Sequence, residues 1–460
     1  MDSRSSFRLT EHMMAVDALS ESVTALRQHP LPESLDARAG LLLLDLFGVT
    51  AAGSRTPELR ELTRHWAADK GETAPLGSDV HTSAETAAVL DSIASCCLEL
   101  DEGNKYASGH PAAHVVPAAV AATRLTDAPV SGQTFVSAVV GGYEVAARFG
   151  YALSRDDRWH THGHWGATGA AAATAFIWNA DTDGIAAAID ASTALIHVAP
   201  WALVLDGSFA RNLWISGAVR AGLDAARLSA AGLVRNTGAV EHTLGDIVGH
   251  LDLERLTEDL GERWLTLEGY TKRHASCSYT HTAVDTVQSL RSHATWTADD
   301  IEQVHVRTHS LAKPLFGRHP TTRLGAMFSL PFVVSAALIA DSIDSDTLDP
   351  NGPTFVAAER FSDRVEVNVS AGLDALLPHR RAAEVSIEFQ NGERISAATP
   401  NPIGDVDHFP LDYGAIHRKL VRLIGERDTT ALADMVEQLP SCDDVAELLA
   451  SSPIVSANTA

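Results

Sequence analysis

The chain has 460 residues, of which 45% are hydrophobic and 20% charged, so we expect a folded protein with more than one domain. Its 59 Asp and Glu residues against 35 Lys and Arg give a formal charge of −24, which argues against nucleic acid and anionic membrane surfaces as partners. An anionic substrate would therefore need a local cationic pocket.

The N-terminal residues, the most apolar run and the cysteines bear on where the protein is expected to reside. The first residues, MDSRSSFRLTEHMM, lack the apolar core of a signal peptide. The most apolar run, GLLLLDLFGV, is interrupted by Asp45 and is too short to span a bilayer. The four cysteines form no CxxC pair and no spacing typical of a zinc site or a disulfide framework. We therefore expect a cytoplasmic protein.

The first half of the chain is rich in alanine, and its apolar residues recur at helical spacing. This periodicity predicts helices over residues 32–53, 83–100, 131–152, 165–179 and 208–232. Polar or proline starts and glycine ends support several of these boundaries. The segment GATGAAAATAF has so many small residues that its helix must pack very closely against its neighbours.

Near residue 265 the pattern changes to short alternating runs, which are typical of strands. Such runs cover residues 302–310 and 364–370, and AEVSIEFQNGERISAAT places Asn-Gly between two more, which predicts a hairpin. Helical periodicity returns over residues 279–292 and 324–342, and again from about Asp405 to the C-terminal DVAELLASSP.

These patterns predict a mainly α protein in which a large helical domain is completed by the C-terminal helices and carries an inserted α+β lid domain. The predicted parts are residues 1–266 for the first part of the helical domain, 267–402 for the lid, and 403–460 for the C-terminal helices.

One predicted connection between helices, LELDEGNKYASGHPAAHVVPA, carries far more titratable side chains than a loop needs. They are Glu99, Asp101, Glu102, Lys105, Tyr106, His110 and His114. Carboxylates at the C-terminal end of a helix oppose its dipole, so this placement favours a functional role over a solvated helix end.

Three further polar clusters fall at the ends of predicted helices. They are His160, His162 and His164 in WHTHGHWG; Arg211 and Asn212 in FARNLW; and Lys272, Arg273, His274, Cys277 and His281 in TKRHASCSYTH. Histidines, carboxylates and cations together are the groups that proton transfer on an anionic substrate requires. A second interpretation treats each histidine as an ordinary cap or solvated side chain.

Two other functions remain open from these residues. Alternate histidines on a strand face the same way, so His160, His162 and His164 are compatible with a metal-dependent hydrolase. A non-catalytic paralogue that binds a metabolite would also fit. No Gly-rich nucleotide loop, GxSxG elbow or HExxH motif occurs, so we expect chemistry without a cofactor.

Four motifs occur in a fixed order over nearly the whole length: LDLFGVTAAGS, LDEGNKYASGHPAAHVVPAA, HTHGHWGATGAAAA and KRHASCSYTHTAVD. In these motifs the chain resembles the MmgE/PrpD family, which includes 2-methylcitrate dehydratase, cis-aconitate decarboxylase and iminodisuccinate epimerase. The resemblance implies a cofactor-independent homodimer. It also implies a lyase (dehydratase or decarboxylase) or isomerase that abstracts a proton next to a carboxylate of a small di- or tricarboxylate.

The resemblance also assigns roles to residues of this chain. It implies His110, His160 and Lys272 as catalytic residues, and Glu99, Asp101 and His281 as residues that support them. The residues expected to bind the substrate are Lys105, Arg211, Asn212, Arg273 and Cys277.

Three positions depart from the family pattern. Arg211 and Asn212 stand where many members carry a Lys, Cys277 stands where the decarboxylase carries a His, and Phe332 stands where a Tyr is frequent. These departures argue against a faithful cis-aconitate decarboxylase and leave a dehydratase, an epimerase or another specificity open.

Overall fold

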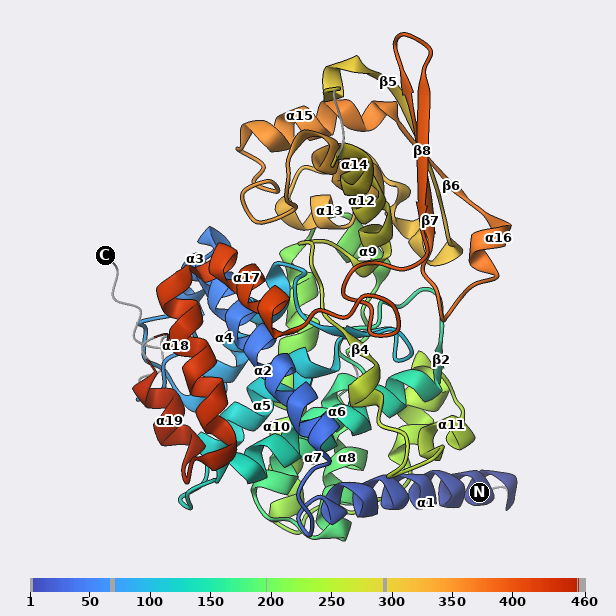
Figure 1. Cartoon of the computed structure of the whole chain (residues 1–460). Helices are drawn as coiled ribbons and strands as arrows, with labels where there is room; N and C mark the ends of the chain where they lie inside the picture. Colours follow the sequence, from blue (N-terminus) through green and yellow to red (C-terminus); the bar gives the residue numbers. More distant parts are fainter. Residues whose placement is uncertain (1–2, 67–70, 196, 293–295, 453, 455–460) are drawn as a thin grey trace.

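The computed structural model describes residues 3–66, 71–195, 197–292, 296–452 and 454, with side chains from residue 8 onward. Helices dominate, and a small mixed sheet lies in the C-terminal half of the chain. Figure 1 shows two bodies, a larger one built of long helices and a smaller one that contains the sheet. The predicted fold class, mainly α with an α+β part, is confirmed.

The larger body contains the helices that precede the sheet in the chain. They are α1 (Ser3–Ala25), α2 (Glu33–Ser54), α3 (Pro57–Trp66), α4 (Ala84–Cys97), α5 (Pro111–Arg124), α6 (Gly132–Ala152), α7 (Gly166–Ile177), α8 (Thr182–Ser192), α9 (Trp201–Leu205), α10 (Leu213–Ala230) and α11 (Leu253–Thr257). Two short antiparallel pairs join its loops: β1 (Gly103–Asn104) with β4 (Gly269–Tyr270), and β2 (Leu153–Arg155) with β3 (Gly249–Leu251).

The smaller body, hereafter the lid, contains the four-stranded sheet and the helices around it. Its elements are α12 (Ser278–Arg291), β5 (Ile301–Thr308), α13 (Arg323–Met327), α14 (Leu330–Ile339), α15 (Pro353–Phe361), β6 (Val365–Val369), α16 (Ala371–Asp374), β7 (Ala383–Phe389) and β8 (Arg394–Thr399). The strand order is β6-β5-β7-β8, with β5 and β6 parallel and the other pairs antiparallel.

The predicted Asn-Gly hairpin joins β7 to β8. Gly392 adopts a φ of +83°, the left-handed conformation that such a turn requires. Buried and half-buried residues alternate along β7, so one face of the sheet is covered, and α12 and α14 pack against it. The apolar core of the lid is continuous with that of the larger body.

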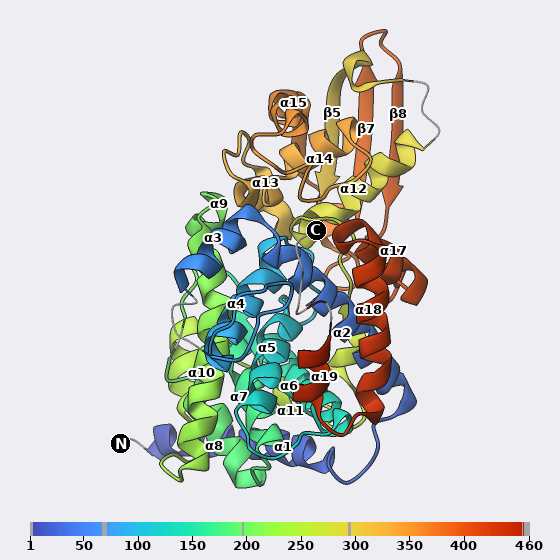
Figure 2. The same cartoon turned by 90° about the vertical axis from the view of Figure 1, so that its left-hand side faces the viewer.

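The chain after the sheet returns to the larger body. It forms α17 (Tyr413–Ile424), α18 (Glu426–Gln438) and α19 (Val445–Ser451). Figure 2 shows α17 and α18 alongside α2, against which both pack, so the two ends of the chain share one body. The boundaries at residues 266 and 402 stay a prediction. No helix among the described residues is both long and apolar enough to cross a membrane.

The small-residue helix α7 lies at the centre of the larger body, as its sequence predicts. Every residue of α7 is buried, and α5, α6, α8 and α10 pack around it. A Cβ on either Gly142 or Gly169 would run into the backbone carbonyl of the other, so these glycines allow α6 and α7 to approach closely. The segment from His160 to His164 therefore leads directly into a helix that is tightly packed on its neighbours.

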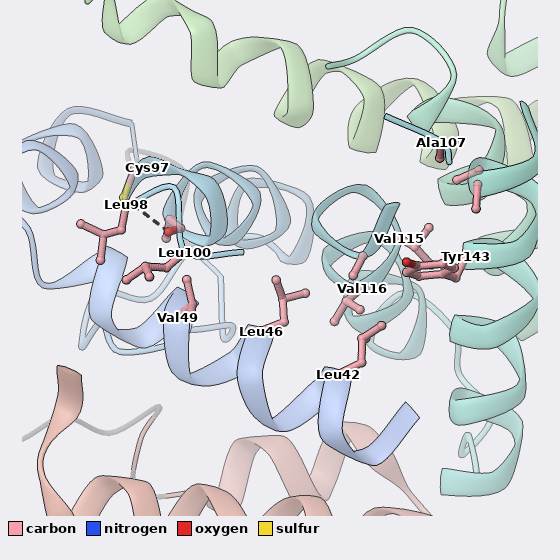
Figure 3. Packing of buried hydrophobic residues seen from close by; sticks show 14 of the residues in the cluster. Leu42, Leu46, Val49, Cys97, Leu98, Leu100, Ala107, Val115, Val116 and Tyr143 are labelled. Atoms are coloured by element: carbon pink, nitrogen blue, oxygen red, sulfur yellow. Dashed lines mark hydrogen bonds between the residues drawn. The ribbon is translucent and has the colours of Figure 1, made fainter. Parts of the chain in front are cut away.

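Figure 3 shows how the apolar core reaches the polar loop after α4. Leu42, Leu46 and Val49 project from one face of α2, and Leu100 and Val116 are packed in the same cluster. All five are almost completely buried. Because Leu100 is anchored in this core, its neighbours in the loop have fixed positions.

Two predicted helices differ in detail. Residues 324–342 form two helices rather than one, because the Ser329 hydroxyl caps α14 by accepting the Phe332 N–H at 3.2 Å and Pro331 occupies its first turn. The helix predicted at 208–232 begins with a 3₁₀ turn over residues 209–212, and α10 follows.

Candidate active site

The polar loop between α4 and α5 is shaped by a strand pair. β1 lies antiparallel to β4, with Gly103 opposite Tyr270, and a Cβ at Gly103 would run into the Tyr270 ring. Backbone hydrogen bonds of 2.7 and 3.2 Å between Asn104 and Gly109 close the loop. His110 is then the N-cap residue of α5, whose first residue is Pro111. The pairing with β4 brings the loop beside the segment that carries Lys272.

Two carboxylates of the loop face two cations in the interior. Both oxygens of Glu99 are used, one by the guanidinium of Arg211 and the other by Lys272 Nζ at 2.9 Å. Lys272 Nζ also lies 3.6 Å from Asp101. All four side chains are almost completely excluded from solvent. Their charges therefore interact in a medium of low polarity, where pairing is required.

Asp101 connects this ion-pair network to His110. Asp101 Oδ2 lies 3.3 Å from His110 Nδ1, and the same nitrogen lies 2.5 Å from the backbone carbonyl oxygen of Glu102. Burial raises the pKa of Asp101, and the charge of Lys272 opposes that rise. Burial and the charge of Lys272 both hold the pKa of His110 well below its ordinary value, so its imidazole is neutral near pH 7.

His110 and His160 contact a third histidine from two sides. The His162 ring centroid lies 4.9 Å from that of His110 and 4.3 Å from that of His160. Burial is the first cause that lowers the pKa of both His160 and His162, followed by Arg155 for His160 and by His160 itself for His162. The cluster is therefore a group of neutral imidazoles. Asp101 lies between one of them, His110, and the ammonium group of Lys272.

Aromatic side chains enclose His160. Its ring centroid lies 4.5 Å from Trp201, 5.8 Å from Trp214 and 6.2 Å from Phe328. Phe328 belongs to the lid, and its ring also lies 5.7 Å from the Arg211 guanidinium carbon. Figure 2 shows α9, which begins at Trp201, beside α13 of the lid. The histidines thus lie where the two bodies meet, a common location for small-molecule sites.

The three histidines of HTHGH do not lie on a strand. Residues 160–164 form an irregular turn with Gly163 at a φ of +98°, not the strand that the metal hypothesis needs. His164 Nε2 donates to the His160 carbonyl at 3.1 Å, and His164 Nδ1 accepts the Trp165 N–H at 3.0 Å. In the described part of the chain, no three His, Cys, Asp or Glu side chains are grouped to hold a metal ion.

His114 has a structural place beside the cluster. It is fully buried, its Nδ1 donates to the His110 carbonyl at 2.8 Å, and its Nε2 accepts the Gly163 N–H at 3.3 Å. These bonds tie the first turn of α5 to the HTHGH turn. His114 therefore helps to fix the positions of the two loops that carry His110 and His160.

Three residues expected at the site have partners elsewhere. Lys105 Nζ pairs with Asp405 at 3.2 Å, and with Asp407. Arg273 is partly exposed and lies 3.4 Å from Asp285. His281 Nε2 donates to the Ser276 carbonyl at 3.1 Å. These contacts hold the lid junction together, and none of them joins the histidine cluster.

The remaining predicted residues lie around the Arg211 side of the site. Asn212 Oδ1 accepts from Arg211 Nη1 at 2.8 Å, and Cys277 precedes α12 with its N–H bonded to the Met327 carbonyl at 3.0 Å. Burial raises the pKa of the Cys277 thiol, so the thiol is neutral. Phe332 lies in the lid core, with its ring centroid 4.7 Å from that of Phe355, rather than at the site.

Sequence reasoning missed three cations near the cluster. Lys419 Nζ donates to Asp45 at 2.7 Å and to the Leu100 carbonyl at 3.1 Å. Arg155 contributes to the low pKa of His160. Arg381 is buried, and its guanidinium donates to the Lys105 carbonyl of the loop at 3.3 Å. Asp45 inside an apolar helical run was a signal that a buried cation must exist, but nothing in the sequence indicated which one.

Comparison with known proteins covers most of the chain. Residues 17–252 match the model of the MmgE/PrpD N-terminal domain, and residues 274–444 match that of the MmgE/PrpD C-terminal domain. A cis-aconitate decarboxylase-like protein of Aspergillus oryzae is 24% identical over 93% of this chain and 95% of its own length. A cis-aconitate decarboxylase of Aspergillus terreus is 22% identical over 91% and 92%, respectively.

The Aspergillus terreus relative is named for cis-aconitate decarboxylation, the activity against which the departures at Arg211, Cys277 and Phe332 argue. Phe332 lies away from the histidines, so that departure says little about the site. Arg211 keeps a positive charge where many members carry a Lys. Since both family models match in order and together span most of the sequence, the chain belongs to the MmgE/PrpD family.

Proposed function

We propose that the chain is a lyase or isomerase that moves a proton on the carbon next to a carboxylate of a small di- or tricarboxylate, using its own side chains. The observation that carries this proposal is the hydrogen bonding of His110 and His160. It supports opposite proton roles for two imidazoles that are neutral at rest and contact the same third ring.

His110 is the base in this proposal. The Glu102 carbonyl oxygen beside its Nδ1 can only accept a hydrogen bond, so Nδ1 carries the proton and Nε2 keeps a free lone pair. When Nε2 takes a proton from the substrate, Asp101 is placed 3.3 Å from Nδ1 to stabilise the imidazolium. A neutral His110 near pH 7 is in the protonation state that a base requires.

His160 is the acid. Its Nδ1 accepts the backbone N–H of His162 at 3.3 Å, so in the neutral ring the proton resides on Nε2. To act as the acid, His160 must first take up a proton; its imidazolium then gives the Nε2 proton to a leaving hydroxyl in a dehydration or to carbon in a decarboxylation or epimerisation, and the ring returns to its neutral form. The aromatic enclosure by Trp201 and Phe328 keeps water from competing for that proton.

Lys272 and Arg211 supply the positive field. Removing a proton beside a carboxylate creates an enolate-like intermediate with an additional negative charge, which fixed cations stabilise without reorganisation. Because Glu99 already binds both cations, their charges are held in place in the free protein. Glu99 and Asp101 act on the cations and on His110 rather than on the substrate, since direct contact would bring like charges together.

The similarity to cis-aconitate decarboxylases supports an unsaturated polycarboxylate as a substrate. The test is incubation in D₂O with cis-aconitate, 2-methylcitrate and related di- and tricarboxylates, followed by NMR. We expect loss of water, loss of carbon dioxide or deuterium uptake with at least one of them, and the signal that appears identifies the reaction. Turnover that strictly requires an added metal ion, or no turnover of any carboxylate, would contradict the proposal.

A further inference from the structure

Six cationic side chains are buried in the described part of the chain. They are Lys105, Arg148, Arg211, Lys272, Arg381 and Lys419. Five of them form an ion pair with a carboxylate: Lys105 with Asp405, Arg148 with Glu144, Arg211 and Lys272 with Glu99, and Lys419 with Asp45. Among these six, Arg381 stands alone without a carboxylate partner.

The contacts of Arg381 do not replace a counter-ion. Its side chain is 4% exposed, and its guanidinium donates to the Ser278 hydroxyl at 3.2 Å and to the Lys105 carbonyl at 3.3 Å. The Tyr270 and Tyr279 rings lie 5.5 and 5.2 Å from its guanidinium carbon. Hydrogen bonds and aromatic faces reduce the cost of burying the charge, but a buried cation normally has an anion beside it.

Arg381 contacts the loop that carries the proposed base, through the Lys105 carbonyl. Tyr270, beneath its guanidinium, pairs with Gly103, and the adjacent residue Glu102 holds His110 Nδ1 through its carbonyl. The charge of Arg381 also contributes to the low pKa of His110, after burial and Lys272. A carboxylate bound to Arg381 would therefore lie near the reacting carbon.

Among the described residues, no carboxylate forms an ion pair with Arg381. Asp405 is the carboxylate whose charge reaches Arg381, but its two oxygens each lie 3.2 Å from Lys105 Nζ. Glu99 and Asp101 lie within ion-pair distance of Lys272, Arg211 and His110 instead. A bound anion is therefore a candidate for the missing counter-ion.

We propose that Arg381 binds one carboxylate of the substrate and thereby selects for polycarboxylates over analogues that lack that group. Arg211 and Lys272, already paired, stabilise charge that develops during the reaction, whereas Arg381 recognises charge present in the ground state. This assignment rests on the proposed function for its substrate class. Its test, however, is equilibrium binding and needs no turnover.

Two probe compounds that differ only in one terminal carboxylate can test this assignment. Propane-1,2,3-tricarboxylate has three carboxylates, and 2-ethylsuccinate replaces one terminal carboxylate by a methyl group. Calorimetry should show that the wild type prefers the tricarboxylate by about tenfold or more, as a charge-assisted bidentate contact predicts. In Arg381→Gln that preference should disappear, and in Arg381→Lys part of it should return.

A purely structural role of Arg381 would weaken both probes equally and leave their ratio unchanged, which would overturn the proposal. Wild-type protein that binds neither probe, or binds both alike, would overturn it as well. Arg364→Gln is the matched control, because Arg364 is a lid arginine with an aromatic contact to Phe361 and one backbone acceptor, Ile301. Loss of preference in Arg381→Gln without turnover of any carboxylate would refute the reaction and retain the carboxylate site.

Discussion

The pairing of Asp101 with His110 allows a graded prediction for Asp101→Asn. Usually an aspartate behind a catalytic histidine fixes the imidazole tautomer, and its loss costs about 10⁴-fold in turnover because the wrong nitrogen carries the proton. Here the Glu102 carbonyl at 2.5 Å already keeps the proton on Nδ1. The substitution should therefore remove only the stabilisation of the imidazolium.

The size of that stabilisation follows from the distances. An Asp101 oxygen 3.3 Å from Nδ1 would attract a full positive charge with about 5 kcal/mol at an effective dielectric constant of about 20. The Asn that replaces the carboxylate keeps a carbonyl oxygen beside Nδ1, so roughly half of this attraction, about 2–3 kcal/mol, is lost. We expect kcat to fall about 30- to 150-fold, since 1.36 kcal/mol corresponds to a factor of ten.

The assay is the pH dependence of turnover of the best carboxylate from the NMR screen. Because Asp101 favours the charged imidazole, its loss lowers the pKa of His110 further, and the acid limb of kcat/KM should move to lower pH. Asp285→Asn is the matched control: Asp285 is also buried, and it lies 2.8 Å from His274 in the lid. A loss below threefold, a loss near 10⁴-fold, or an acid limb that stays in place would refute this reasoning.

Three further predictions concern stability and the roles of other histidines. Lys419→Met should destabilise the fold by about 3–5 kcal/mol in urea unfolding, because it leaves Asp45 buried and unpaired; an unchanged midpoint would refute a structural ion pair. Burial raises the pKa of Glu102 to about 8, so its contribution to stability is present below a pH of about 4.5 and is lost as the pH rises through 8. In Glu102→Gln, unfolding midpoints should therefore fall less over that range than in the wild type, and parallel curves would contradict this. His164→Ala should keep turnover within about tenfold, whereas His160→Ala should lose about 10²-fold or more; the reverse order would restore the metal hypothesis.

The sequence predicted the elements of the fold well because their signals are local. Apolar periodicity and small residues located α2, α6 and α7, and Asn-Gly located the β7–β8 turn, each within a few residues. The break between α13 and α14 was missed, because a capping serine followed by proline inside an apolar run can be recognised only when the chain turns there.

The functional roles of the site residues stay a prediction, but the structure shows which of them lie together. His110, His160 and Lys272 were named from motifs, and they are linked through Asp101 and His162. Arg381 was missed because it stands out only by lacking a carboxylate partner. Ion pairs between distant parts of the chain cannot be recognised in the sequence, and neither can their absence. Lys105 was expected at the substrate, but Asp405, three hundred residues later, holds it. The homodimer stays a prediction, and the described cluster is built from one chain.

The most direct test of the central claim is solvent deuterium exchange in two histidine variants. His110→Gln and His160→Gln would be incubated in D₂O with the carboxylate that the wild type converts and with its product, and NMR would follow the carbon-bound proton next to the carboxylate. If His110 is the base and His160 the acid, His160→Gln still exchanges that proton while forming little product, and His110→Gln does neither. Exchange at the wild-type rate in His110→Gln, or loss of exchange only in His160→Gln, would contradict the assignment.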